Sequence, residues 1–175
     1  MDARQRAARV RLMAFDIDGV MTDGGLTYSD DGREQKTFNV MDGLGLKLLQ
    51  RAGIELAIIT GRKSGVVAAR AADLGIRHVF QGNEDKRTVC TALLADLGLQ
   101  WPDVGYMGDD IIDLPVLRIA GFAIAPANAH PLVRERVHAV TDARGGHGAV
   151  REAAEFVLAA QGRLETLLSP YLDER

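Results

Sequence analysis

The chain has 175 residues, of which 47% are hydrophobic and 26% charged, and its formal net charge is −3. These values are typical of one globular domain over residues 1–175, and the acidic balance argues against nucleic acid or an anionic membrane as a general partner. The single cysteine, Cys90, excludes an internal disulfide and favours a cytoplasmic protein. No apolar run approaches the ~18 residues of a membrane span, and residues 1–11 lack the apolar core of a signal peptide.

Short apolar runs alternate with longer amphipathic segments along the chain. Strands are predicted over residues 10–16, 55–60, 78–80, 104–107 and 122–124. Helices are predicted from about residue 44 to 53 and over residues 64–74, 86–97, 111–120 and 150–160. Ser29-Asp30-Asp31-Gly32 joins residues 25–28 to 34–38 and predicts a β-hairpin over about residues 24–38. The alternation indicates an α/β, Rossmann-like three-layer sandwich with a central parallel sheet, from which the hairpin protrudes.

Polar residues follow several of the predicted strands. In an open parallel sheet, ligands bind beyond the carboxyl ends of the strands. We therefore expect four places in the sequence to converge on one crevice: Asp16 with Asp18, Thr60 with Gly61, Lys86, and Gly108-Asp109-Asp110. Taken singly, each has an ordinary interpretation. An aspartate or threonine after a strand usually caps a helix, and a lysine in a first helical turn is usually solvated.

Five carboxylates would point into this crevice, those of Asp16, Asp18, Asp109, Asp110 and Asp113. Without a cation they would repel one another, and some would have to be protonated. A site made of oxygen ligands suits Mg²⁺, which keeps several waters and completes its coordination with a substrate phosphate. With Lys86 as a second positive centre, the pattern predicts a phosphoryl-binding site.

Four short motifs follow one another in a recognisable order. They are Asp16-Ile17-Asp18-Gly19-Val20, Thr60-Gly61-Arg62, Lys86 and Gly108-Asp109-Asp110-x-x-Asp113. In these motifs the chain resembles the haloacid dehalogenase phosphatase superfamily. Longer segments within residues 38–43, 129–131 and 144–152 resemble the phosphatases of 3-deoxy-D-manno-octulosonate 8-phosphate in lipopolysaccharide biosynthesis. The resemblance extends over residues 12–164 and implies a Mg²⁺-dependent phosphoric monoester hydrolase.

The resemblance implies catalytic roles for Asp16, Asp18, Thr60 and Lys86. Asp16 would attack phosphorus and become an aspartyl phosphate, which divides one slow hydrolysis into two easier steps. Asp18 would protonate the leaving sugar oxygen and then activate water. Thr60 and Lys86 would bind the phosphoryl group and offset its developing charge.

The resemblance also implies substrate and metal ligands. The substrate contacts would be Thr60, Gly61, Arg62, Lys63 and Lys86, with Arg62 and Lys63 meeting the carboxylate of a phosphorylated sugar acid. Mg²⁺ would be bound by the carboxylates of Asp16 and Asp109 and by the backbone carbonyl of Asp18. Asp110 and Asp113 would hold waters on the metal or orient Lys86.

The sequence leaves no room for a cap domain over this site. Only a hairpin and one helix fit between Asp18 and Thr60, and only a helix and a strand fit between Lys86 and Asp109. Members of the resembled family form homotetramers, in which hairpins associate and a C-terminal tail reaches a neighbour's site. Here the hairpin contacts would involve Leu26, Tyr28 and Phe38, and the tail would be residues 162–175. The alternative is an exposed hairpin without a partner.

Other functions stay open from the sequence. The closest is a nonulosonate 9-phosphate phosphatase, although those relatives tend to carry an acidic residue where this chain has Arg62. A non-catalytic oligomerisation domain of the cytidylyltransferase type is a second alternative, and a receiver domain is a third. Residues 144–148 are either a flexible loop or a loop near the sugar or a neighbour's tail. His130 and Cys90 are interpreted as structural residues.

Overall fold

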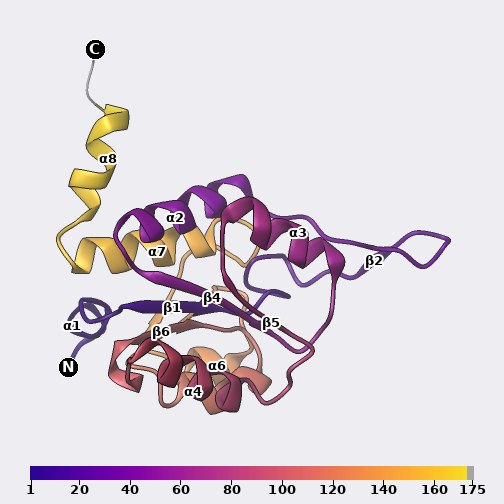
Figure 1. Ribbon diagram of the computed structural model, residues 1–175, viewed down its shortest axis with the longest axis horizontal. Coiled ribbons are helices and arrows are strands. Elements are labelled where there is room, and N and C mark those ends of the chain that lie inside the picture. The colour runs from indigo at the N-terminus through magenta and orange to yellow at the C-terminus, as the bar shows by residue number, and fades with distance from the viewer. Residues whose placement is uncertain (173–175) are drawn as a thin grey trace.

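A six-stranded, all-parallel sheet forms the centre of the computed structural model, which describes residues 1–172 (Figure 1). The strand order is β5-β4-β1-β6-β7-β8. The strands are β1 (Leu12–Phe15), β4 (Glu55–Thr60), β5 (His78–Gln81), β6 (Val104–Met107), β7 (Phe122–Ala125) and β8 (Ala139–Val140). The chain runs outward from β1 to β5 and then returns to the other side of β1. Therefore β1 and β6 flank the switch point at which such sheets bind ligands.

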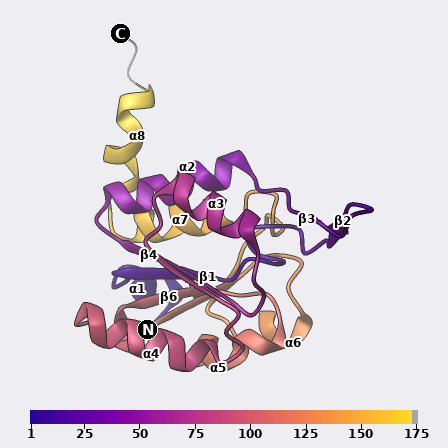
Figure 2. The ribbon, with the colours of Figure 1, turned by 45° about the vertical axis from the view of Figure 1, so that its right-hand side comes forward.

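Helices cover both faces of the sheet (Figures 1 and 2). One layer contains α2 (Val40–Arg51), α3 (Gly65–Leu74) and α7 (Ala149–Ala160), and the other contains α4 (Lys86–Leu97), α5 (Leu114–Leu117) and α6 (Pro131–Arg134). The remaining helical segments are α1 (Ala3–Ala7), α8 (Leu164–Leu172) and the 3₁₀ turns η1 (Trp101–Asp103) and η2 (Ile111–Asp113). Within residues 1–172, none of the helices has the length and apolar character needed to cross a membrane.

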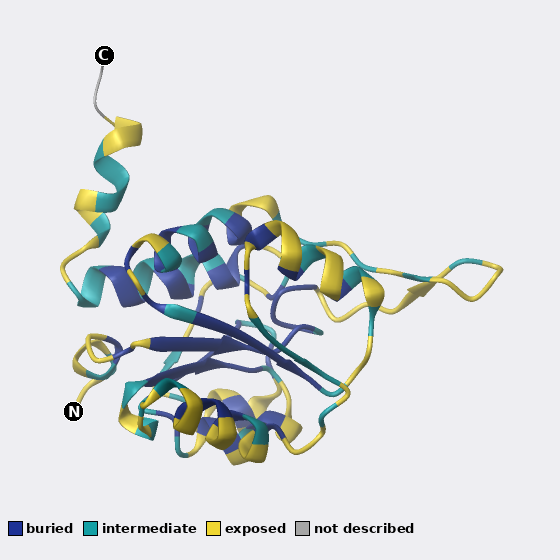
Figure 3. Ribbon diagram, viewed as in Figure 1, coloured by how far each residue is buried: buried dark blue, intermediate teal, exposed yellow. Residues whose placement is uncertain are grey.

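The continuous apolar run of β1 packs into two cores, because successive side chains of a strand point to opposite faces. Met13 and Phe15 belong to the cluster formed with α2 and α7, whereas Leu12 and Ala14 belong to the cluster formed with α4. All four residues are completely buried. The central strands of the sheet are accordingly coloured as buried in Figure 3. Burial on both faces leaves the ends of the strands as the places where polar side chains reach solvent.

The predicted hairpin is present and protrudes from the body of the molecule (Figure 1). Its strands, β2 (Thr27–Tyr28) and β3 (Glu34–Gln35), pair antiparallel but are shorter than expected. At the tip, Ser29 Oγ donates a hydrogen bond to Asp31 Oδ1 (2.5 Å). Few backbone pairs hold the hairpin, so its position depends on side-chain contacts with the body.

The sequence led us to expect Phe38 among the contacts between hairpins, but the structure places it against its own chain. It packs against the core cluster beneath α2, and the guanidinium of Arg70 lies 5.8 Å from its ring centroid. Leu26 and Tyr28 are 52% and 54% exposed. These two side chains remain available for contact with another molecule, whereas Phe38 anchors the hairpin to its own chain.

Residues 111–120 do not form the single helix that the sequence predicts. The turn η2 comes first, and the short α5 follows it. Asp110 Oδ1 accepts a hydrogen bond from the Ile111 amide (2.7 Å), and Asp113 Oδ2 accepts from the amides of Asp109 and Asp110 (3.1 and 3.3 Å). These side chains take the backbone donors of the first turn and tighten it into a 3₁₀ conformation.

The other predicted strands and helices are present, and no cap domain occurs within residues 1–172. The hairpin and α2 are the elements between β1 and β4, and α4 and η1 are those between β5 and β6. The sequence did not predict α8, which has nine residues, nor α1, α6 and β8, which have five, four and two residues. Segments as short as the last three carry no clear periodicity.

Candidate active site

Asp16 stands directly after β1, at the switch point of the sheet. Its backbone amide donates to the Met107 carbonyl (3.0 Å), so the ladder with β6 extends to this residue and fixes its backbone. The side chain is 7% exposed, and Asp16 Oδ2 lies 2.9 Å from Lys86 Nζ. The Asp16 carboxylate is therefore held in place at the carboxyl end of β1, where the sequence predicts the site.

Lys86 begins α4, and its ammonium is shared between two carboxylates. Nζ lies 2.9 Å from Asp16 and 2.7 Å from Asp113 Oδ1, and the lysine side chain is 1% exposed. Asp113 Oδ1 also accepts a hydrogen bond from the Tyr106 hydroxyl (3.0 Å). Burial alone would lower the pKa of Lys86, but Asp113 and Asp16 raise it above its usual value. Lys86 is therefore a charged group that Asp113 orients toward Asp16.

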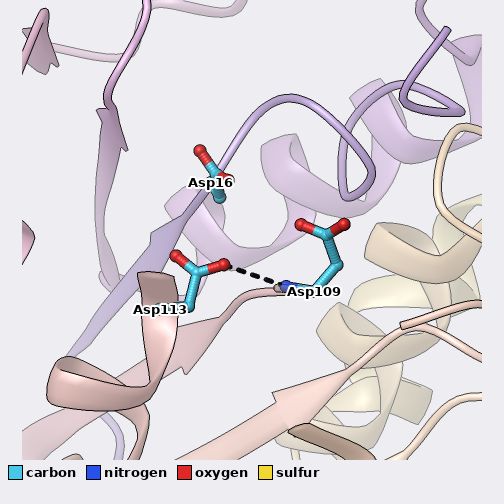
Figure 4. Close-up of side chains that lie close together, drawn as sticks. All are labelled: Asp16, Asp109 and Asp113. Carbon is cyan, nitrogen blue, oxygen red and sulfur yellow. Dashed lines mark hydrogen bonds between the residues drawn. The ribbon is translucent and has the colours of Figure 1, made fainter. Parts of the chain in front are cut away.

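Asp109, which follows β6, completes a cluster of three carboxylates. Asp16, Asp109 and Asp113 each offer an oxygen, and these oxygens lie within 4.8 Å of one another (Figure 4). Asp109 Oδ1 is buried and has no hydrogen-bond partner among residues 1–172. Gly19 leaves the space that Asp109 occupies, since a Cβ on Gly19 would lie 2.0 Å from Asp109 Oδ2. The φ of Gly19 is +92°, which also favours glycine.

The three carboxylates of this cluster share a single cation, the ammonium of Lys86. Burial, followed by the Asp113 carboxylate, raises the pKa of Asp16 to about 6. Burial, followed by Asp113 and Asp16, raises the pKa of Asp109 to about 7. Lys86 offsets part of the charge, but it pairs with Asp16 and Asp113 and not with the free oxygen of Asp109. A partnerless carboxylate oxygen beside a second carboxylate is a donor set that suits Mg²⁺.

A cavity of about 300 Å³ opens over these carboxylates. The residues that line it are Asp16, Asp18, Gly24, Leu26, Thr60, Gly61, Arg62, Asp109, Asp110 and Ile112. Thr60, at the end of β4, is 2% exposed, and its Oγ1 accepts a hydrogen bond from the Arg62 amide (3.4 Å). The carboxyl ends of β1, β4 and β6 thus meet at one cavity, as the sequence predicts.

Asp18 is held by two cations at the mouth of this cavity. Lys36, just after β3, forms an ion pair with Asp18 Oδ1 and lies 3.3 Å from Glu34 Oε1. Arg62 Nε lies 3.5 Å from Asp18 Oδ2, and Arg62 Nη2 lies 2.7 Å from Glu34 Oε1. We call these four residues the hairpin network. Although Lys36 belongs to the protruding segment, its side chain is 1% exposed.

Sequence reasoning missed Lys36 and Glu34. Their one signal is the period of two in the predicted strand, which places Glu34, Lys36 and the apolar Phe38 on one face.

Lys63, in contrast with the other predicted substrate contacts Thr60, Gly61 and Arg62, does not line the cavity. Its aliphatic chain lies over Gly82, where a Cβ would come within 2.4 Å of Lys63 Cε. Asp110 lines the cavity and caps η2.

Residues 144–148 pack against the loop that carries the catalytic candidates. The Gly146 amide donates to the Val20 carbonyl (3.1 Å), and the Gly145 amide donates to Asn128 Oδ1 (2.8 Å). A Cβ on Gly145 would lie 1.8 Å from the Gly19 carbonyl oxygen. The structure therefore places this segment as a support for the turn after Asp18. His130 caps α6, where its Nδ1 accepts from the Leu132 amide (3.2 Å), and Cys90 is buried.

Comparisons with known proteins give one consistent assignment. The profile of the haloacid dehalogenase-like hydrolases matches residues 74–152. The 3-deoxy-D-manno-octulosonate 8-phosphate phosphatase KdsC of Yersinia pestis is 47% identical over 164 residues, which are 94% of this chain and 88% of that protein. The chain belongs to this phosphatase family of haloacid dehalogenase-like hydrolases. It therefore has the family's α/β fold without a cap.

Solved structures of family members superpose on the chain. The Moraxella catarrhalis 3-deoxy-D-manno-octulosonate 8-phosphate phosphatase, in complex with magnesium ion, phosphate ion and KDO, is 42% identical, with a TM-score of 0.95 and coverage of 97% of both chains. The cobalt-bound form of the Haemophilus influenzae phosphatase YrbI is 37% identical, with a TM-score of 0.91 and coverage of 96% of this chain and 99% of that chain.

Proposed function

We propose that this chain hydrolyses 3-deoxy-D-manno-octulosonate 8-phosphate to the free sugar acid and phosphate, in lipopolysaccharide biosynthesis. The observation that carries the proposal is the pairing of Asp16 with Lys86 beside the free oxygen of Asp109. This arrangement offers a nucleophile, a cation for the phosphoryl oxygens and a ligand for a metal ion. The identity to phosphatases of this substrate supports the choice of sugar.

In the first step, an Asp16 carboxylate oxygen forms a bond to phosphorus while the bond from phosphorus to the sugar oxygen breaks. Asp18 gives a proton to that leaving oxygen. Lys86 and the Thr60 hydroxyl donate hydrogen bonds to the phosphoryl oxygens, which stabilises the charge that spreads over them. The products of this step are the free sugar acid and an aspartyl phosphate at Asp16.

In the second step, Asp18 takes a proton from a water molecule as the water attacks phosphorus. The bond between phosphorus and Asp16 breaks, and phosphate leaves with the water oxygen. Mg²⁺ would be bound by the carboxylates of Asp16 and Asp109 and by the Asp18 backbone carbonyl, and when bound it neutralises carboxylate and phosphoryl charge. Asp113 keeps Lys86 directed at the reacting group, and Asp110 would hold a water on the metal.

Recognition of the sugar acid falls to the mouth of the cavity. Arg62 lines it, and because its side chain is 43% exposed, the guanidinium can turn from Glu34 toward a substrate carboxylate. Leu26 and Ile112 add apolar surface against the sugar ring. The Gly61 backbone lies beside Thr60 and leaves room for the phosphoryl group.

Phosphate release from a panel of sugar phosphates tests this proposal. The panel contains 3-deoxy-D-manno-octulosonate 8-phosphate, a nonulosonate 9-phosphate and p-nitrophenyl phosphate, each assayed with Mg²⁺ and with excess chelator. We expect the highest kcat/KM for the eight-carbon substrate and no turnover in chelator. A higher kcat/KM for the nine-carbon substrate would reassign the sugar, and full activity in chelator would contradict the metal assignment.

We also propose a cytoplasmic homotetramer, in which the hairpins associate through Leu26 and Tyr28. Support comes from the exposure of these two side chains and from the unpaired, buried Cys90. The tail was expected to reach a neighbour's site, but α8 lies away from its own active site, at the opposite end of the molecule from the hairpin (Figures 1 and 2). Its Leu164, Leu167 and Leu168 pack against the core of the same chain.

Among the described residues of the tail, the most exposed large apolar side chains lie at its end. Tyr171 and Leu172 are 54% and 72% exposed, and residues 173–175 lie outside the described residues. Deletion of residues 169–175 should change kcat or KM for the sugar phosphate and leave p-nitrophenyl phosphate turnover nearly unchanged. Unchanged kinetics with both substrates would contradict the proposed contact, and sedimentation of the same variant would report the oligomeric state.

A further inference from the structure

A second cavity lies at the amino ends of the strands, on the side of the sheet opposite the active site. Its volume is about 510 Å³, and its main lining residues are Arg6, Arg9, Trp101, Arg118, Gly121 and His138. Trp101, Gly121 and His138 lie just before β6, β7 and β8. This cavity is therefore at the amino ends of the strands, whereas the catalytic candidates follow the carboxyl ends.

Positive charge gathers in this cavity without an opposing carboxylate. Three arginines line it, and no aspartate or glutamate of the described residues does so. Arg6 Nη1 donates to the Gly121 carbonyl (3.1 Å), whereas the side chains of Arg9 and Arg118 have no hydrogen bond or ion pair within residues 1–172. The whole chain has a net charge of −3, so the positive charge of this cavity is opposite in sign to that of the chain. Guanidinium groups around one cavity repel one another, and an anion would remove that repulsion.

The walls of the cavity are fixed and include a further donor. The His138 Nδ1 accepts a hydrogen bond from the Ala123 amide (2.8 Å), which leaves the ring proton on Nε2. Burial, followed by Arg6, lowers the pKa of His138, so the ring stays neutral. The Gly121 amide donates to the Trp101 carbonyl (2.8 Å), and a Cβ on Gly121 would lie 2.3 Å from the Pro102 carbonyl oxygen. The floor between Trp101 and Gly121 is thus closely packed.

We propose that this cavity binds a small anion that carries phosphoryl groups, at a site separate from the active site. Guanidinium groups match the oxygens of a phosphoryl group with paired hydrogen bonds, and three of them match the charge of a diphosphate. Trp101 presents an indole beside these donors, against which a planar group can pack. The ligand is therefore an inorganic diphosphate or the diphosphate portion of a nucleotide.

Trp101 is the only tryptophan of the chain, so intrinsic fluorescence reports on this cavity. The protein is titrated with pyrophosphate and, separately, with ADP, without added divalent cation and at constant ionic strength. We expect a saturable change in tryptophan fluorescence that persists in Asp16→Asn. Arg6→Gln and Arg118→Gln should each raise the midpoint about tenfold or more. Arg4→Gln, on the same helix as Arg6 but outside the lining, should leave it unchanged.

The comparison of the two probes identifies the source of the anion. A lower midpoint for ADP indicates a nucleotide, and an equal or lower midpoint for pyrophosphate indicates an inorganic anion; either result supports the site. The absence of a saturable change with both probes would overturn the proposal, as would its loss in Asp16→Asn or an unchanged midpoint in Arg118→Gln. Melting temperatures of the variants verify folding, and Arg118 is exposed, so its replacement leaves the core intact.

Discussion

Lys36 and Asp18, eighteen positions apart in the chain, form an ion pair in which the lysine side chain is 1% exposed. The lysine comes from the arm of the protruding hairpin, and the aspartate comes from the loop after β1. The hairpin therefore contributes a group to the candidate active site in addition to its exposed surface. Asp18 is the proposed acid and base, so its orientation determines whether a proton reaches the leaving oxygen.

Replacement of Lys36 by glutamine should lower kcat for the sugar phosphate by about 10- to 100-fold. This loss is part of the rate acceleration that a correctly positioned general acid and base usually provides. The reason is that Asp18 loses the partner that fixes one of its oxygens. Steady-state kinetics measure kcat, and circular dichroism verifies that the variant is folded. Arg33→Gln, in the same hairpin but with a side chain that is 84% exposed, is the matched control and should keep wild-type kinetics. Equal kcat for both variants would show that Lys36 does not position Asp18.

Gly19→Ala should impair metal binding. The new Cβ would need the space of the Asp109 carboxylate, 2.0 Å away, in addition to adopting a φ of +92°. We expect the Mg²⁺ concentration for half-maximal activity to rise at least about tenfold and the fold to lose roughly 1–3 kcal/mol. Gly32→Ala is the control, since Gly32 has a φ of +78° but no atom within 4 Å of its Cβ position. It should lose stability without a change in Mg²⁺ dependence; a similar Mg²⁺ shift in both variants would contradict the steric argument.

The metal-free protein should become less stable as the pH rises. The pKa values of Asp16 and Asp109, about 6 and about 7, exceed the ordinary 3.8. Between these limits the folded state binds more protons than the unfolded state, so the free energy of unfolding falls with rising pH. In chelator, it should be at least about 1 kcal/mol lower at about pH 7.5 than at about pH 5.

Two controls isolate this effect in urea unfolding experiments. The pKa of His138 is lowered by burial and by Arg6, so this group raises stability with rising pH in the same range and acts in the opposite direction; the slope of the wild type must therefore be compared with that of Asp109→Asn. We expect a smaller decline in the variant, and we expect Mg²⁺ to restore wild-type stability at about pH 7.5. A wild-type slope equal to that of Asp109→Asn would show that Asp109 does not titrate as described.

The sheet and the position of the site were predictable because buried parallel strands carry continuous apolar runs. Residues 55–60 and 104–107 coincide with β4 and β6, and the polar residues that follow them lie at one cavity. The contacts of Lys36 were not predictable, because a lysine between polar neighbours is usually solvated. Its pairing with Asp18 depends on how the hairpin arm folds over the cavity, and this tertiary arrangement cannot be predicted from the local sequence pattern.

The turn of residues 111–113 illustrates a second limit. Periodicity predicts one helix there, but Asp110 and Asp113 bond to backbone amides and shape a 3₁₀ turn. Competition of this kind between side chain and backbone depends on the local geometry of the site. The tail of residues 162–175 was expected to reach a neighbour's site, yet Leu164, Leu167 and Leu168 of α8 pack against their own chain.

Turnover of Asp16→Asn tests the central claim most directly. Phosphate release from 3-deoxy-D-manno-octulosonate 8-phosphate is measured with saturating Mg²⁺ for the wild type, Asp16→Asn and the control Asp73→Asn, which changes an exposed carboxylate on α3. If Asp16 forms the bond to phosphorus, its amide variant folds, binds the sugar phosphate and releases no phosphate, whereas Asp73→Asn matches the wild type. Wild-type turnover by Asp16→Asn would mean that another group attacks phosphorus, and the proposed mechanism would be wrong.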